Sequence, residues 1–213
     1  MNIYRMLVAG ALALLPSCLT YATTVYSDST SFLNQVEPGY YLETFDNDAF
    51  GNEGNALSFS GNGFSYQGLA YGGYSYGNGQ FYGAYYGGNL ILAVTQQGTD
   101  FTLTFSPNIT AVGGTFFMID SNLNVTDGVM TITLLDGTQV TINDGTPFTG
   151  FTSPTPIGSL TMDSNRLSAL DNLYVGAFTG ALSGVPEPRT LGLLAGGLGF
   201  MLARRRLRRY LDR

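Results

Sequence analysis

Two neighbouring segments alternate apolar side chains with threonines, and each ends at an Asp-Gly pair. In 129–135 apolar residues occupy every second position before Asp136-Gly137, and 138–143 repeats the pattern before Asp144-Gly145. A period of two places the apolar side chains on one face of a β-strand, and Asp-Gly suits the tight turn of a hairpin. The pattern predicts a β-hairpin over 129–135 and 138–143, with one face toward a core and the other toward water.

The same period recurs through much of the chain. The apolar side chains of 99–105 share one face, and after a turn at Pro107-Asn108 the alternation resumes as far as Ile119. Short strands at this spacing are typical of sheets that water reaches on one side. We expect an all-β fold, a single β-sandwich or jelly roll over 23–184, which is long enough for one core. Further strands are predicted at 40–45, 57–60, 64–67, 90–94, 147–151, 158–162 and 170–175.

One short helix is predicted before the sheets. Ser29 or Thr30 would cap a turn that runs through Phe32 to Val36 and ends at Pro38-Gly39. We expect this helix to cover one edge or end of the sandwich.

Residues 51–88 differ from the rest of the body in composition. They hold 12 glycines and seven tyrosines. Three interpretations remain open: a loop that contacts sugar rings, a self-associating low-complexity segment, or a long loop or irregular hairpin on the sheet. The candidate glycan contacts are Tyr71, Tyr74, Tyr76, Tyr82, Tyr85 and Tyr86.

The N-terminus has the arrangement of a secretory signal peptide. Arg5 precedes an apolar stretch from Met6 to Leu15, and small residues then predict cleavage between Ala22 and Thr23. Residues 1–22 are therefore expected to be removed. Lipidation at Cys18 is the alternative, and since Cys18 is the one cysteine of the chain, the body forms no disulfide.

The C-terminus combines a proline-rich motif, an apolar stretch and a basic cluster. The motif Pro186-Glu187-Pro188 precedes the apolar residues 190–203. Arginines beside an apolar segment stay on the cytoplasmic side of a membrane, so the body is predicted to lie outside it. The basic cluster consists of Arg204, Arg205, Arg206, Arg208 and Arg209.

In that order, the motif, the apolar stretch and the arginines resemble the sorting segment of the PEP-CTERM proteins of Gram-negative bacteria. The resemblance covers 185–213. It implies export, transient anchoring in the inner membrane through a membrane-seeking helix, and processing near the motif by an exosortase. It also implies an association with exopolysaccharide and biofilm. A plain tail anchor is the alternative, although 190–203 would span about 21 Å of a bilayer core of about 30 Å.

The exported body is strongly acidic. Between Thr23 and Ser183 there are 13 acidic residues and one basic residue, Arg166, which gives a net charge of −12. A body without a basic patch does not bind phosphates or other polyanions through counterion release. The charge therefore excludes nucleic acid and anionic polysaccharide as partners.

Several kinds of catalysis are also excluded. The chain has no histidine, and all nine of its basic residues are arginines. Triads, histidine-bound zinc and lysine Schiff bases are therefore absent. A carboxylate pair for glycoside hydrolysis is the remaining option, with Glu43, Asp46 and Asp48 as candidates. We expect no enzymatic activity.

A calcium site is a hypothesis for the two ends of the body. Residues 43–47 and 169–176 resemble the first and last strands of exported bacterial jelly-roll domains, which lie side by side and often hold structural calcium where they meet. Glu43, Asp46 and Asp171 would supply carboxylates, and backbone carbonyls the other oxygens. The alternative is that Asp171 and Asn172 bond neighbouring backbone. Residues 120–127 form a weaker oxygen-rich candidate, and no other cofactor is expected.

Together these features predict an exported, non-enzymatic protein of the cell surface or extracellular matrix. Its expected partners are the exosortase machinery, transiently the inner membrane, and exopolysaccharide or further copies of itself. A carbohydrate-binding module that uses the tyrosine-rich segment is the first alternative, and a glycoside hydrolase the second.

Overall fold

The computed structural model describes residues 22–46, 50–72, 79–145 and 147–181, which belong to one compact unit, Tyr21–Ala181. Antiparallel strands dominate it. The elements are β1 (Thr24–Tyr26), α2 (Ser29–Leu33), β2 (Tyr41–Glu43), β3 (Gly51–Gly54), β4 (Ala56–Gly61), β5 (Phe64–Gly72), β6 (Phe81–Tyr86), β7 (Asn89–Val94), β8 (Thr99–Phe105), β9 (Ala111–Ile119), β10 (Met130–Leu134), β11 (Gln139–Ile142), β12 (Phe148–Thr152), β13 (Ser159–Ser164) and β14 (Leu167–Gly176).

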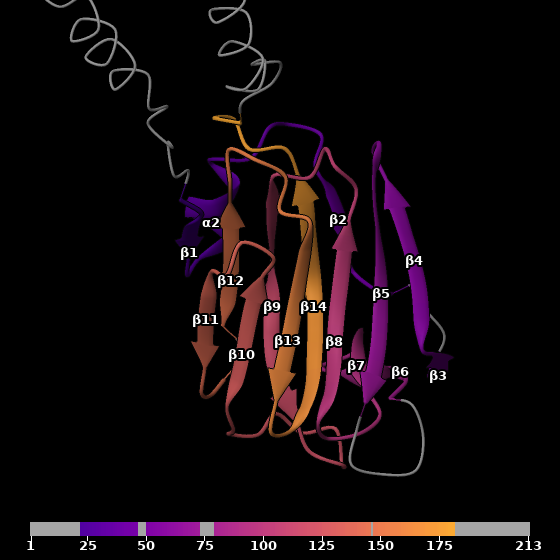
Figure 1. The fold of residues 1–213 in the computed structure, drawn as a ribbon. Helices are drawn as coiled ribbons and strands as arrows, with labels where there is room; N and C mark the ends of the chain where they lie inside the picture. The colour runs from indigo at the N-terminus through magenta and orange to yellow at the C-terminus, as the bar shows by residue number, and fades with distance from the viewer. Residues whose placement is uncertain (1–21, 47–49, 73–78, 146, 182–213) are drawn as a thin grey trace, which may run out of the picture. The chain divides into compact units, whose positions relative to one another are not determined.

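These strands form two sheets that face each other (Figure 1). The six-stranded sheet has the order β11-β10-β13-β8-β5-β4 and lies in front in Figure 1. The eight-stranded sheet has the order β1-β12-β9-β14-β7-β6-β3, and β2 also pairs with β14. The prediction of an all-β sandwich is therefore confirmed.

Strand β14 is shared by three partners. It pairs with β9 along one edge, with β7 beside Leu170 and with β2 beside Tyr174. Since β9 occupies one edge of β14, the other edge pairs first with β7, at Ala169 and Leu170, and then with β2, from Leu173 to Val175. The register with β9 shifts between Asp171 and Tyr174, where Asn172 has a φ of 50°. This β-bulge bends the strand at the point where one partner replaces the other.

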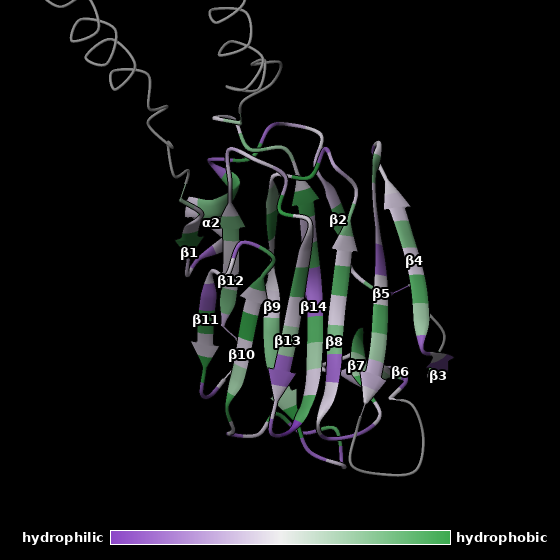
Figure 2. Cartoon of the chain, viewed as in Figure 1, coloured by the Kyte–Doolittle hydropathy of each residue, from purple (hydrophilic) through white to green (hydrophobic). Residues whose placement is uncertain are grey.

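The main core lies between the sheets. Alternation along β8 and β10 points one set of side chains inward and the other set toward water, as Figure 2 shows by alternating colours. Phe81 and Phe101 come from opposite sheets and meet edge to face, with ring centroids 4.8 Å apart. The predicted hairpin of β10 and β11 is confirmed, with Met130 opposite Ile142.

The central strands of the eight-stranded sheet are covered on both faces, so the prediction that water reaches one side of each sheet is wrong for them. Every residue of β7 after Asn89 is buried. On the outer face, Ile91 and Phe117 belong to a second cluster, against which Leu123 and Val125 pack from the turn after β9. Because that turn and α2 shield the outer face, apolar residues occur there at consecutive positions.

The predicted helix is confirmed but short. Asp28, not Ser29 or Thr30, caps it, since its Oδ1 accepts a hydrogen bond of 2.7 Å from the Ser31 backbone N–H. Phe32 is fully buried between α2 and the outer face of β9 and β12. Val36 lies beyond the helix, in a bridge with Phe178.

Segment 51–88 is not a loop in its described part. It forms β3 to β6 and the turn at Gly87-Gly88 that leads into β7. In β5, Tyr66 faces the core while Ser65 and Gln67 face solvent. The strands predicted at 57–60 and 64–67 are confirmed as the antiparallel pair β4 and β5, whereas the glycine content of the rest of the segment favoured a loop or irregular hairpin.

Candidate functional site

Three aromatic side chains gather at an edge of the eight-stranded sheet. The ring of Phe50 stacks on Tyr85, with centroids 5.5 Å apart and planes at 18°, and meets Tyr82 edge to face at 5.6 Å. Phe50 is 56% exposed and Tyr85 57%. We call Phe50, Tyr82 and Tyr85 the aromatic edge. Rings of this size are normally buried, so a stacked pair left in solvent marks a surface suited to a flat apolar partner.

Local backbone pairing makes room for the aromatic edge. Gly51 of β3 lies opposite Gly83 of β6, so neither position carries a side chain between the rings. Gly51 also has a φ of 126°, which side-chain-bearing residues rarely adopt. Phe50 was not among the predicted glycan contacts, which were all tyrosines, although its position directly before the glycine-rich segment was a usable signal.

The other predicted glycan contacts do not form one surface with this edge. Tyr86 is 38% exposed and packs on Phe117. Tyr71 belongs to β5 of the six-stranded sheet, opposite Asp100. Tyr74 and Tyr76 lie outside the described residues.

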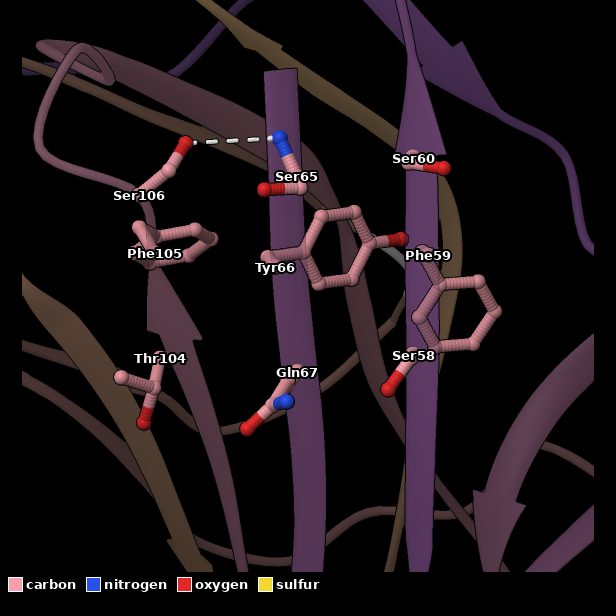
Figure 3. A pocket seen from close by; sticks show the side chains of 9 residues that line it. All are labelled: Ser58, Phe59, Ser60, Ser65, Tyr66, Gln67, Thr104, Phe105 and Ser106. Atoms are coloured by element: carbon pink, nitrogen blue, oxygen red, sulfur yellow. Dashed lines mark hydrogen bonds between the residues drawn. The ribbon is translucent and has the colours of Figure 1, made fainter.

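The outer face of the six-stranded sheet holds a shallow groove (Figure 3). Its volume is about 360 Å³, and β4, β5 and β8 supply its walls. Tyr66 and Phe105, which also line it, belong to the core, and Phe59 beside them is partly buried, so the groove presents apolar surface as well as hydroxyl and amide groups. These polar side chains are Ser58, Ser60, Ser65, Gln67, Thr104 and Ser106.

The three residues of the calcium hypothesis are not equivalent. The carboxylate of Glu43 already has partners within two residues in the chain, since it accepts hydrogen bonds from the Tyr41 hydroxyl and the Phe45 backbone N–H. Asp171 accepts a bond of 2.8 Å from the Asn172 N–H, as the alternative interpretation expected. Among the described residues no three acidic side chains form a group able to hold a metal. Glu43 therefore fits a calcium site poorly, and the site stays a prediction.

The strands that carry these residues do lie side by side. Glu43 in β2 is opposite Leu173 in β14, which places 43–47 beside the bulge. Burial raises the pKa of the Asp171 carboxyl above its usual 3.8, and repulsion from Asp46 adds to the rise. The folded chain thus holds a charge at Asp171 that its surroundings disfavour.

Asparagine at position 171 should therefore stabilise the fold at neutral pH. A raised carboxyl pKa in the folded state means that stability falls as the pH rises through 3.8 and above. The variant Asp171→Asn cannot ionise, yet its side-chain oxygen still accepts the bond from Asn172. We expect its melting temperature to exceed that of the native chain at pH 7 and to match it at pH 3. The control is Asp163→Asn, at an exposed position. Equal melting temperatures of Asp171→Asn and the native chain at pH 7 would show that the charge of Asp171 does not destabilise the fold.

The sorting features fall outside the described residues. The motif Pro186-Glu187-Pro188, the arginine cluster and residues 1–21 are not described. At the predicted cleavage site, Ala22 and Thr23 directly precede β1, and the Thr23 hydroxyl donates to Asp136. None of the described helical residues forms an apolar helix of the length that a bilayer requires.

Comparison with protein-family models, curated proteins and solved structures returned no match. The fold by itself defines the class, an all-β protein of two antiparallel sheets.

Proposed function

We propose that the chain is an exported, non-enzymatic surface or matrix protein of jelly-roll type, whose body contacts neutral polysaccharide through the aromatic edge. The observation that supports this most directly is the stacked pair of Phe50 and Tyr85, each more than half exposed. Sugar rings present flat C–H faces that pack on such rings. The net charge of −12 between Thr23 and Ser183 makes a neutral glycan the fitting partner, since an acidic one would be repelled.

Export and tethering rest on the two chain ends. The predicted signal peptide and the segment 185–213 would bring the body across the inner membrane and hold it there until an exosortase acts near Pro186-Glu187-Pro188. The acidic body contributes solubility outside the membrane.

Self-association is a second candidate, favoured by strand β4. Ala56–Gly61 ends the six-stranded sheet and carries neither charge nor proline, the features that usually prevent edge-to-edge pairing. Sedimentation of the purified chain over a range of concentrations separates this role from glycan binding. Replacing Ser58 by lysine should abolish an assembly built on β4.

Alanine at Tyr85 should weaken glycan binding about tenfold, because loss of an aromatic contact of roughly 1–1.5 kcal/mol corresponds to that factor. The measurement is affinity electrophoresis of the native and variant chains in gels containing neutral glucans, mannans or galactans. Phe50→Ala should have a similar effect.

The matched control is Tyr71→Ala. Tyr71 is 44% exposed but belongs to the other sheet, so its loss should leave the affinity unchanged. Equal losses for Tyr71→Ala and Tyr85→Ala, or no binding to any neutral polysaccharide, would refute the proposed contact.

A further inference from the structure

A cavity lies at one end of the sandwich, away from the residues assigned to the aromatic edge. The turn between β7 and β8, the end of β9 and the start of β14 surround it. Its volume of about 430 Å³ falls within the range of roughly 300–1,000 Å³ of small-molecule sites. Among the side chains that line it are Gln96, Asp120 and Arg166.

Arg166 is the one basic residue between Thr23 and Ser183, and the fold holds it in place. Its Nε donates a hydrogen bond of 3.3 Å to the backbone carbonyl of Asp127. A Cβ on Gly128 would come within 2.7 Å of Arg166 Cγ, so glycine is needed where the side chain crosses. Among the described residues the terminal nitrogens of the guanidinium have no partner. Arg166 is exposed and anchored only through Nε, so these nitrogens are donors that can turn toward the cavity.

Asp120 provides a fixed acceptor on the same cavity. Its Oδ1 accepts hydrogen bonds from the backbone N–H groups of Asn124 at 2.9 Å and Asn122 at 2.8 Å. These bonds, that from Asn124 most of all, lower the pKa of Asp120 below 3.8, so the group is ionised at neutral pH. Oδ2 is not used by these bonds and remains available to a ligand.

Gln96 carries an unsatisfied acceptor. Its Oε1 is buried and has no hydrogen-bond partner among the described residues. A buried acceptor without a partner is unfavourable. Gln96 as a whole is only partly buried, so a turn of its side chain would bring Oε1 to a ligand hydroxyl in the cavity, and that bond would remove the penalty. The cavity therefore combines a cationic donor, an anionic acceptor and a buried neutral acceptor.

We propose that this cavity binds one neutral sugar residue through adjacent hydroxyl groups. Each hydroxyl both donates and accepts, so one pair of hydroxyls can accept from Arg166 and donate to Asp120 and Gln96 at once. A carboxylate or phosphate would meet Arg166 but also the Asp120 charge, within a body of net charge −12. The site is separate from the aromatic edge and does not depend on it.

The test is a titration of the full chain with D-glucose, D-galactose and D-mannose, each added alone. The chain is kept in a detergent whose head group contains no sugar, and binding is followed by calorimetry and by NMR shifts of the Gln96 side-chain amide. We expect at least one of the three sugars to bind. Arg166→Gln and Gln96→Ala should each weaken that binding about tenfold or more.

Two controls separate binding from folding. Asp163→Asn changes the charge at an exposed position of β13 and should leave the affinity unchanged. Gln96→Ala removes an unsatisfied group, so its melting temperature should stay close to that of the native chain while its affinity falls. A loss of sugar binding that merely follows a loss of stability would overturn the assignment.

Other outcomes also decide the proposal. No binding of any of the three sugars, or binding of D-glucuronate in preference to all of them, overturns it. Tyr85→Ala should leave monosaccharide binding at the cavity intact. If Tyr85→Ala abolished both polysaccharide binding and monosaccharide binding, the sugar would lie on the aromatic edge and not in the cavity. If the native chain bound monosaccharide but no polysaccharide, the assignment of the cavity would stand and the proposed role of the aromatic edge would fail.

Discussion

Replacing Phe101 by alanine should lower the free energy of unfolding by about 3–5 kcal/mol, the usual range for removing a buried phenylalanine. Phe101 is fully buried in β8, and its ring meets Phe81 of the opposite sheet at 4.8 Å. The substitution would leave a cavity where the two sheets join, and it would remove the edge-to-face contact as well. The measurement is urea unfolding of the full chain, monitored by circular dichroism.

The control lies on the same strand. Thr104 is exposed on the outer face of β8, so Thr104→Ala should change the stability by no more than about 0.5 kcal/mol. A loss of less than 1 kcal/mol for Phe101→Ala, with an unchanged dependence on urea, would mean that the contact between the sheets is not central to the core.

Alanine at Gly150 should cost about 1–3 kcal/mol, the range for overpacking a filled site. Gly150 of β12 lies opposite Gly113 of β9, and the pair forms a flat surface under Phe32 of α2. A Cβ on Gly150 would come within 2.6 Å of Phe32 Cδ2. The helix can then remain only if the ring or the strand shifts. Urea unfolding measures the loss, and faster proteolysis between β1 and β2 would report release of α2.

A smaller residue at position 32 should relieve this clash. In Gly150→Ala combined with Phe32→Leu, the loss of stability should be smaller than the sum of the two single losses, because the added methyl group and the ring compete for the same space. Strict additivity, or a neutral effect of Gly150→Ala, would show that Phe32 does not rest on the glycine pair.

Local sequence pattern predicted every strand of the six-stranded sheet. The alternation in 99–105 and 129–135 matches β8 and β10, because one face of each is wet and the period is visible. It predicted the eight-stranded sheet less well. Strand β6 was missed, since glycine and tyrosine in Phe81–Tyr86 suggested a loop, and pairing with β7 provides the stabilisation that composition does not reveal.

The candidate sites, too, could be predicted from the sequence only in part. The tyrosines of 51–88 were identified from composition, but their distribution over two sheets depends on register. Phe50 meets Tyr85 only because β3 pairs with β6. The cavity around Arg166 joins turns that are far apart in the chain, and no local pattern connects Gln96 with Asp120.

What the sequence alone determined is the class of the body and its charge, because the period of two and the count of ionisable groups are local properties. It also supplied the resemblance of 185–213 to a sorting segment. Only the tertiary structure decided which face of each strand is covered and which aromatic rings remain exposed. Those outcomes depend on long-range pairing, such as β2 beside β14 and α2 over Gly113 and Gly150, in which the partners are distant in sequence and close in space.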